Sequence, residues 1–274
     1  MNDDGEMTVA VVHGIGVSEP GYAAELIAGI RREFIAALRR GNHPPPDPLP
    51  LTFIEIVWDD IVAEQQQELS ARLKSGLERW REPTLWEKWF APLLAPLQKG
   101  ARWLRTDFAA QYISDVIAYR NPQVYEKIQQ RILERLKGGG GPLTFVAHSL
   151  GTVITSDLIY DRSENGTGFS GYALTNFFTL GSPLAVFALR YGTDAFASPV
   201  HMEDPDGRWI NILDRDDPLA YPLKPLNAAY ERAVEKDVEV DTGLFGIAHV
   251  KYWKNPATHR IIAAKLVADY LRHR

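Results

Sequence analysis

The sequence contains no cysteine, and this absence removes several kinds of chemistry at once. Disulfide bonds, thiolate metal sites and cysteine nucleophiles are all excluded. There is also no block rich in lysine and arginine, and the formal net charge is -5. We therefore expect no nucleic-acid partner. The glycine run 138–141 has no Gly-Lys-Ser/Thr after it, so it predicts a turn rather than a phosphate-binding loop.

Long apolar runs are missing as well. The longest nearly apolar stretch, WFAPLLAPL, is too short and too interrupted by proline to span a bilayer. The acidic start, MNDDGEMTVAVV, lacks the basic region and long apolar core of a signal peptide. We therefore expect a cytoplasmic protein, with a peripheral membrane contact left open.

The chain has 274 residues, of which 45% are hydrophobic, and this is enough for a large core in a single domain. Short β-branched runs alternate with segments of helical spacing. Strands are expected in MTVAVVHGIG, before its glycine loop, and at LTFIEIVW, PLTFVAH, ALTNFFTLGS and RWINILD. Helices are expected over 20–40, from 121, from 149, near 183 and from 256. This alternation predicts an α/β fold, with a mostly parallel sheet and helices on both faces.

Residues 59–120 interrupt the alternation. Their first part has helical spacing with a strongly polar reverse side, and their second part concentrates tryptophan and phenylalanine among prolines. We expect an inserted helical cap. Two interpretations stay open: the aromatic side chains pack the cap onto the main domain, or the cap is an amphipathic lid that touches lipid or an acyl chain.

The segment FVAHSLGTVITSDLIYD places Ser149 between a predicted strand and a predicted helix. A serine there is more often a helix N-cap. However, AHSLG is the G-x-S-x-G pattern of a nucleophile elbow, with Ala147 in place of the first glycine. Small residues such as Ala147 and Gly151 let strand and helix approach closely. His148 and Asp157 are expected to pack or hydrogen-bond around this turn, without a chemical role.

A nucleophilic serine needs an anion site as well as a base. The loop in VVHGIG, at the end of the first predicted strand, can direct backbone amides at a developing oxyanion because glycine permits close approach. We expect the amides of Ile15 and Leu150 to be the two donors. His13 could itself be the base, but a histidine in this place more often braces its loop.

The acid and the base are expected after Ser149, in that order. WINILDRDDPLAYPL carries Asp214, Asp216 and Asp217 at the C-terminal end of a predicted strand, where catalytic loops gather. Among the downstream histidines, His249 in GIAHVKYW lies in an apolar loop just before the last predicted helix. Asp214 follows the strand sooner than Asp217 and stays open as the alternative acid.

Four stretches of the sequence resemble the DDHD-domain phospholipases and their bacterial α/β-hydrolase relatives: VAHSLGTVITSDLIYD, LGSPLAVFALR, DPLAYPLKPL and HVKYW. The segment SDVIAY also resembles that family. The resemblance runs in order from VVHGIG to HVKYW, whereas residues 59–105 show little of it. The first stretch is shared by many hydrolases, but the pairing of GSPL with DPLAY is much more specific.

The resemblance implies an α/β-hydrolase fold with Ser149 as nucleophile, Asp217 as acid and His249 as base. It also implies hydrolysis of carboxylic esters of phospholipids or related acyl lipids through an acyl-enzyme, with no cofactor and no metal. An acyltransferase or thioesterase would use the same triad. A non-catalytic module that binds lipid or a partner through the tryptophan-rich cap is a further alternative.

Overall fold

The computed structural model describes residues 6–16, 19–62, 116–191, 200–243 and 247–272 of the chain. The chain divides into two compact units, residues 1–57 with 129–274, and residues 58–128. The cap expected over residues 59–120 lies almost wholly outside the described residues, so it stays a prediction. Among the helices that the structure describes, none combines the length and apolar character needed to cross a bilayer.

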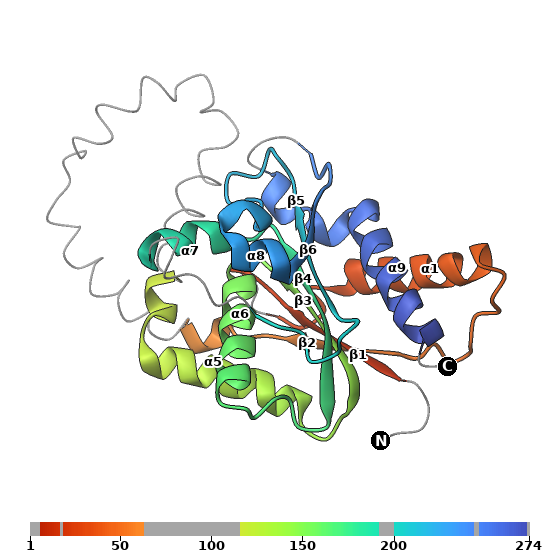
Figure 1. The fold of residues 1–274 in the computed structure, drawn as a ribbon, viewed down its shortest axis with the longest axis horizontal. Coiled ribbons are helices and arrows are strands. Elements are labelled where there is room, and N and C mark those ends of the chain that lie inside the picture. Colours follow the sequence, from red (N-terminus) through yellow and green to blue (C-terminus); the bar gives the residue numbers. More distant parts are fainter. Residues whose placement is uncertain (1–5, 17–18, 63–115, 192–199, 244–246, 273–274) are drawn as a thin grey trace, which may run out of the picture. The chain divides into compact units, whose positions relative to one another are not determined.

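The first unit is built on a six-stranded, all-parallel sheet in the order β2-β1-β3-β4-β5-β6 (Figure 1). The strands are β1 (Met7–Val12), β2 (Leu51–Ile56), β3 (Gly141–His148), β4 (Tyr172–Leu180), β5 (Arg208–Leu213) and β6 (Val234–Glu239). The central strands consist almost entirely of buried residues, as in sheets that are covered on both faces. The predicted α/β class is therefore confirmed, and its arrangement is consistent with an α/β-hydrolase-like fold.

Helices and short 3-10 turns connect the strands. They are α1 (Ala24–Arg40), α5 (Pro122–Leu136), α6 (Leu150–Glu164), α7 (Leu184–Tyr191), η2 (Lys224–Leu226), α8 (Ala228–Ala233), η3 (Ala248–Val250), η4 (Tyr252–Lys254) and α9 (Pro256–Arg272). Helices α1 and α9 lie side by side on one face of the sheet, and α6 covers the other face (Figure 1).

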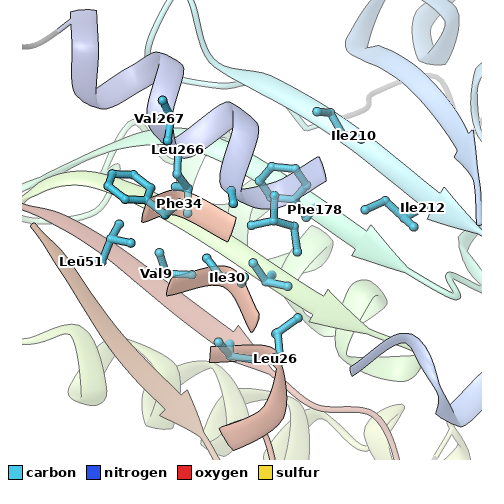
Figure 2. Close-up of a cluster of buried hydrophobic side chains, with 14 of the residues drawn as sticks. Val9, Leu26, Ile30, Phe34, Leu51, Phe178, Ile210, Ile212, Leu266 and Val267 are labelled. Atoms are coloured by element: carbon cyan, nitrogen blue, oxygen red, sulfur yellow. The ribbon is translucent and has the colours of Figure 1, made fainter. Parts of the chain in front are cut away.

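The core of the first unit lies between the sheet and the helix pair α1 and α9 (Figure 2). Helix α1 presents Leu26, Ile30 and Phe34 at helical spacing, and none of these side chains retains any exposure. Leu266 of α9 meets the same cluster (Figure 2). Each such side chain contributes about 1.5–3 kcal/mol by leaving water, so this face of the sheet is a main source of stability.

Two differences from the predicted elements have local physical causes. The helix expected from Pro20 begins at Ala24, after a turn in which the Glu55 carboxylate accepts the amides of Gly21 and Ala23, both at 2.7 Å. Strand β6 has the sequence VEKDVE and was not predicted, because an edge strand with mostly exposed charged residues has no apolar run to mark it.

Candidate active site

Ser149 occupies the sharp turn between β3 and α6. Its backbone has φ 54° and ψ -129°, a conformation that costs an L-residue about 1–3 kcal/mol. It holds the N-cap position of α6, yet its side chain makes no capping hydrogen bond. Ser149 is thus the N-cap residue by position, but its hydroxyl does not cap the helix. The strained turn instead directs the hydroxyl to the C-terminal edge of the parallel sheet.

The tight junction around Ser149 depends on two glycines. A Cβ at Gly14 would lie 2.6 Å from the Cβ of Ser149 and 3.2 Å from its Oγ. A Cβ at Gly151 would lie 2.4 Å from the carbonyl oxygen of His13. The loop after β1 and the first turn of α6 therefore approach each other more closely than any other residue type allows. The small residue expected at position 151 is needed because α6 passes so close to the main chain of His13.

The imidazole of His249 lies between Ser149 and Asp217. Its Nε2 is 2.7 Å from the Oγ of Ser149, and its Nδ1 is 2.9 Å and 2.8 Å from the two carboxylate oxygens of Asp217. Ser149 is 1%, Asp217 3% and His249 5% exposed. Because a carboxylate can only accept, Nδ1 carries the proton that is donated to Asp217, and Nε2 is free to accept the serine proton.

Three donors fix the orientation of the Asp217 carboxylate. Besides His249, the amide of Leu219 donates to Oδ1 and the hydroxyl of Tyr252 donates to Oδ2, each at 2.9 Å. Burial on its own would raise the pKa of Asp217, but the hydrogen bonds from His249, Leu219 and Tyr252 together bring this pKa below its ordinary value. Asp217 is therefore a carboxylate at neutral pH, as an acid that orients a histidine must be.

Tyr252 was not singled out from the sequence, although it lies three positions after His249 in HVKYW. Its hydroxyl donates to Asp217 and accepts the amide of Asp214 at 2.9 Å. Burial and then the neighbouring Asp217 carboxylate raise the pKa of Tyr252 well above its ordinary value. The hydroxyl thus stays protonated and remains a donor. No pattern in the sequence marks Tyr252, because the turns η3 and η4 that bring it to Asp217 are a feature of the folded chain.

Asp214, the alternative acid, has a different set of partners. Its Oδ2 accepts the amide of Thr242 at 2.5 Å and the hydroxyl of Thr242 at 2.7 Å, and its Oδ1 accepts the amide of Asp216 at 2.8 Å. Burial opposes ionisation of Asp214, but these hydrogen bonds lower its pKa overall. The hydroxyl of Thr242 also contacts the carbonyl oxygen of Ala248 at 2.8 Å. Asp214 thus organises the chain before His249, while Asp217 contacts the imidazole.

Two further histidines border the serine. His13 contacts the carbonyl oxygen of Gly14 through Nδ1 at 2.5 Å, and its ring packs edge-on against Tyr22 at 5.0 Å between centroids. These contacts suit a residue that braces its loop. His148 donates from Nε2 to the main-chain carbonyl of His249 at 2.6 Å, so it hydrogen-bonds beside the turn in the way expected from the sequence.

The two expected oxyanion donors lie on the elements that meet at Ser149. Leu150 is the first residue of α6, so its amide has no acceptor within the helix. Ile15 follows Gly14, where an added Cβ would collide with Ser149. Their role as donors stays a prediction. Within the described ranges, no three histidine or acidic side chains are grouped as metal ligands would be.

Comparison with known proteins finds a distant relative. No protein-family model matches the chain. A protein of Schizosaccharomyces pombe (strain 972 / ATCC 24843), named as a probable mitochondrial phospholipase, is 27% identical over 146 residues. The match covers 41% of this chain and only 19% of that protein, so the chain spans a small part of its relative's length.

Proposed function

We propose that the protein is a serine hydrolase that cleaves carboxylic esters of lipids or lipid-like acyl compounds. The observation that carries this proposal is the 2.7 Å contact between the Oγ of Ser149 and the Nε2 of His249, with Asp217 on the other side of the imidazole. A serine in a strained turn, a histidine and an ionised carboxylate in this order are the groups that activate a serine for acyl transfer. The distant likeness to a probable phospholipase supports an acyl lipid as substrate.

In the proposed reaction, the Oγ of Ser149 attacks the acyl carbonyl carbon while its proton passes to the Nε2 of His249. The bond to the alcohol then breaks, and the alcohol leaves with that proton. Water next gives a proton to Nε2 and attacks the acyl carbon. The bond from that carbon to Oγ then breaks, Nε2 returns the proton to Oγ, and the carboxylic acid leaves. Asp217 holds the imidazole in the reactive tautomer and stabilises its cationic form in both steps.

The negative charge on the carbonyl oxygen needs donors in place before the attack. We assign this task to the amides of Leu150 and Ile15, which lie on the two elements that meet at Ser149. Each donor of this kind contributes roughly 3 kcal/mol to the transition state. We further propose that the tryptophan-rich cap expected over residues 59–120 contacts the acyl chain or a lipid interface.

The test is turnover on esters of increasing acyl chain length, with and without phospholipid vesicles. The unaltered protein is expected to hydrolyse the longer esters faster than the short ones, and Ser149→Ala is expected to abolish turnover. Ser156→Ala is the matched control, because Ser156 is a buried serine two turns further along the same helix. Activity confined to short, soluble esters would contradict the lipid part of the proposal, and equal activity of the Ser149→Ala variant would contradict the mechanism.

A further inference from the structure

We infer that His148, the residue before the proposed nucleophile, is a positioning residue that ties the loop of the proposed base to the nucleophile turn. The inference rests on the proposed function, because it concerns how His249 is held. His148 does not exchange protons with substrate in this account. It acts only through the main chain of His249.

The contact that carries the inference joins two neighbouring residues to one histidine. The Nε2 of His148 lies 2.6 Å from the carbonyl oxygen of His249, and the Oγ of Ser149 lies 2.7 Å from the Nε2 of the same His249. The turn therefore holds His249 at two points, one on its main chain and one on its ring. Because residues 148 and 149 are adjacent, the main chain of His249 cannot shift away from the nucleophile turn without breaking the bond to His148.

Ring packing reinforces this hydrogen bond. The His148 ring lies 4.9 Å from the His249 ring, 5.7 Å from Tyr252 and 5.2 Å from Trp253, measured between centroids, and it meets Trp253 edge-on. All three partners come from the segment that forms η3 and η4. His148 is only 5% exposed, so it fills the space between the nucleophile turn and this segment. The hydrogen bond is thus made in a dry environment, where losing a donor is costly.

The charge of His148 is compatible with a purely positioning role. Burial, and after it the nearby His249, lower the pKa of His148 to about 3. The ring is therefore neutral near pH 7. Its Nε2 carries the proton, because the carbonyl oxygen of His249 can only accept. A neutral donor at this place fixes the loop without adding a positive charge beside the imidazolium that forms during the proposed reaction.

The test compares a variant that keeps the ring without the donor with a variant that keeps a donor to the His249 carbonyl without the ring. His148→Phe keeps a ring but removes the donor. In His148→Gln, the side-chain amide nitrogen lies near the position of the histidine Nε2 and can donate in its place. We expect His148→Phe to lower kcat on the order of 100-fold, the effect of a displacement of about 1 Å in a catalytic group, with KM changed less than about twofold. His148→Gln should recover most of that kcat.

His259→Phe is the matched control. His259 is also buried, and its Nε2 also donates to a carbonyl of the same segment, that of Trp253 at 2.8 Å. This variant should lower the unfolding temperature while kcat stays close to that of the unaltered protein. The pH profile of kcat/KM is the second measurement. In His148→Phe, kcat/KM should still fall at low pH as it does in the unaltered protein, and only its maximum value should be lower. The reason is that the ring of His148 is not the group whose protonation causes this fall.

Several results would overturn the inference. An unchanged kcat in folded His148→Phe would do so, as would equal losses in the Phe and Gln variants or loss of the acid limb. If His148→Phe does not fold, His148→Asn takes its place, because the asparagine amide is too short to reach the carbonyl of His249. Equal kcat values for the Asn and Gln variants would then contradict the inference. If the unaltered protein has no turnover, both the proposed function and this inference are contradicted. If the unaltered protein is active and kcat does not depend on the donor at position 148, only the inference is contradicted.

Discussion

The first unit contains two buried regions built in different ways. One is the apolar core between the sheet and helices α1 and α9, where Phe34 and Leu266 are fully buried by packing that has no preferred direction. The other is the polar cluster at the C-terminal edge of the sheet. This cluster consists of Ser149, Asp214, Asp217, His249 and Tyr252.

The polar cluster is almost as buried as the core, but directional hydrogen bonds hold it together. Asp217 and His249 are 3% and 5% exposed, and each has more than one partner. Substitutions in the two regions should therefore affect different properties. Removing apolar volume should reduce the free energy of unfolding, whereas removing a polar partner of His249 should reduce turnover with less effect on stability.

The largest effect is expected when the two buried aspartates are compared. In the proposed mechanism Asp217→Asn should lower kcat on the order of 10⁴-fold, because His249 would lose the carboxylate that selects its tautomer. Asp214→Asn should lower kcat less than about tenfold but weaken folding by about 1–3 kcal/mol, because Asp214 accepts two bonds from Thr242. The measurements are steady-state kinetics and denaturant unfolding of both variants. The opposite order of the kcat losses would assign the acid to Asp214.

The next effect should come from the apolar core. Phe34→Ala removes a fully buried ring from α1 and should lower the free energy of unfolding by about 3–5 kcal/mol. Chemical denaturation measures this change, and titration of reactive serine gives kcat per folded molecule, which should stay unchanged. A large fall in kcat per folded molecule would mean that the two regions are coupled, and the comparison would fail.

A smaller effect on turnover is expected from Tyr252. Tyr252→Phe removes one of the three donors to Asp217 while keeping the ring, so kcat should fall by about tenfold. Tyr230→Phe is a suitable control, because Tyr230 is a buried tyrosine that packs against Trp209 instead of the polar cluster. Equal kcat values for the two variants would indicate that the hydroxyl of Tyr252 does not support Asp217.

The smallest effect should be a dependence of stability on pH. The folded-state pKa of Asp217 lies below its ordinary value of 3.8, so its hydrogen bonds stabilise the fold fully above that pH. This contribution is lost as the pH falls through the lower folded-state pKa. Unfolding curves between pH 6 and pH 2.5, in roughly half-unit steps, should therefore show the stabilities of the unaltered protein and Asp217→Asn converging in acid. Asp216→Asn, at an exposed position in the same turn, is the control.

The elements that carry the polar cluster could largely be predicted from the sequence. The buried runs of β1 and β3 and the spacing of Leu26, Ile30 and Phe34 in α1 identify an alternating α/β chain, because apolar periodicity reports burial directly. Strand β6 escaped prediction because its exposed, charged residues carry no such pattern. The cap over residues 59–120 lies almost wholly outside the described residues and stays a prediction.

The candidate site was predictable in part. The motif around Ser149 and the position of His249 before the last helix indicated two of its members. Only the resemblance favoured Asp217 over Asp214 as the acid. Position along the chain did not separate the two, because the partner that holds Asp214, Thr242, comes after β6 in the sequence. Tyr252 escaped notice for the same reason, since its contact with Asp217 arises from tertiary folding.

The central claim is that the hydroxyl of Ser149 is the nucleophile activated by His249. The most direct test is to treat the folded protein with a fluorophosphonate and to locate the adduct by mass spectrometry of its peptides. We predict a single adduct, on Ser149, that forms much more slowly in His249→Ala. An adduct on another residue, or no adduct on Ser149 in folded protein, would contradict it.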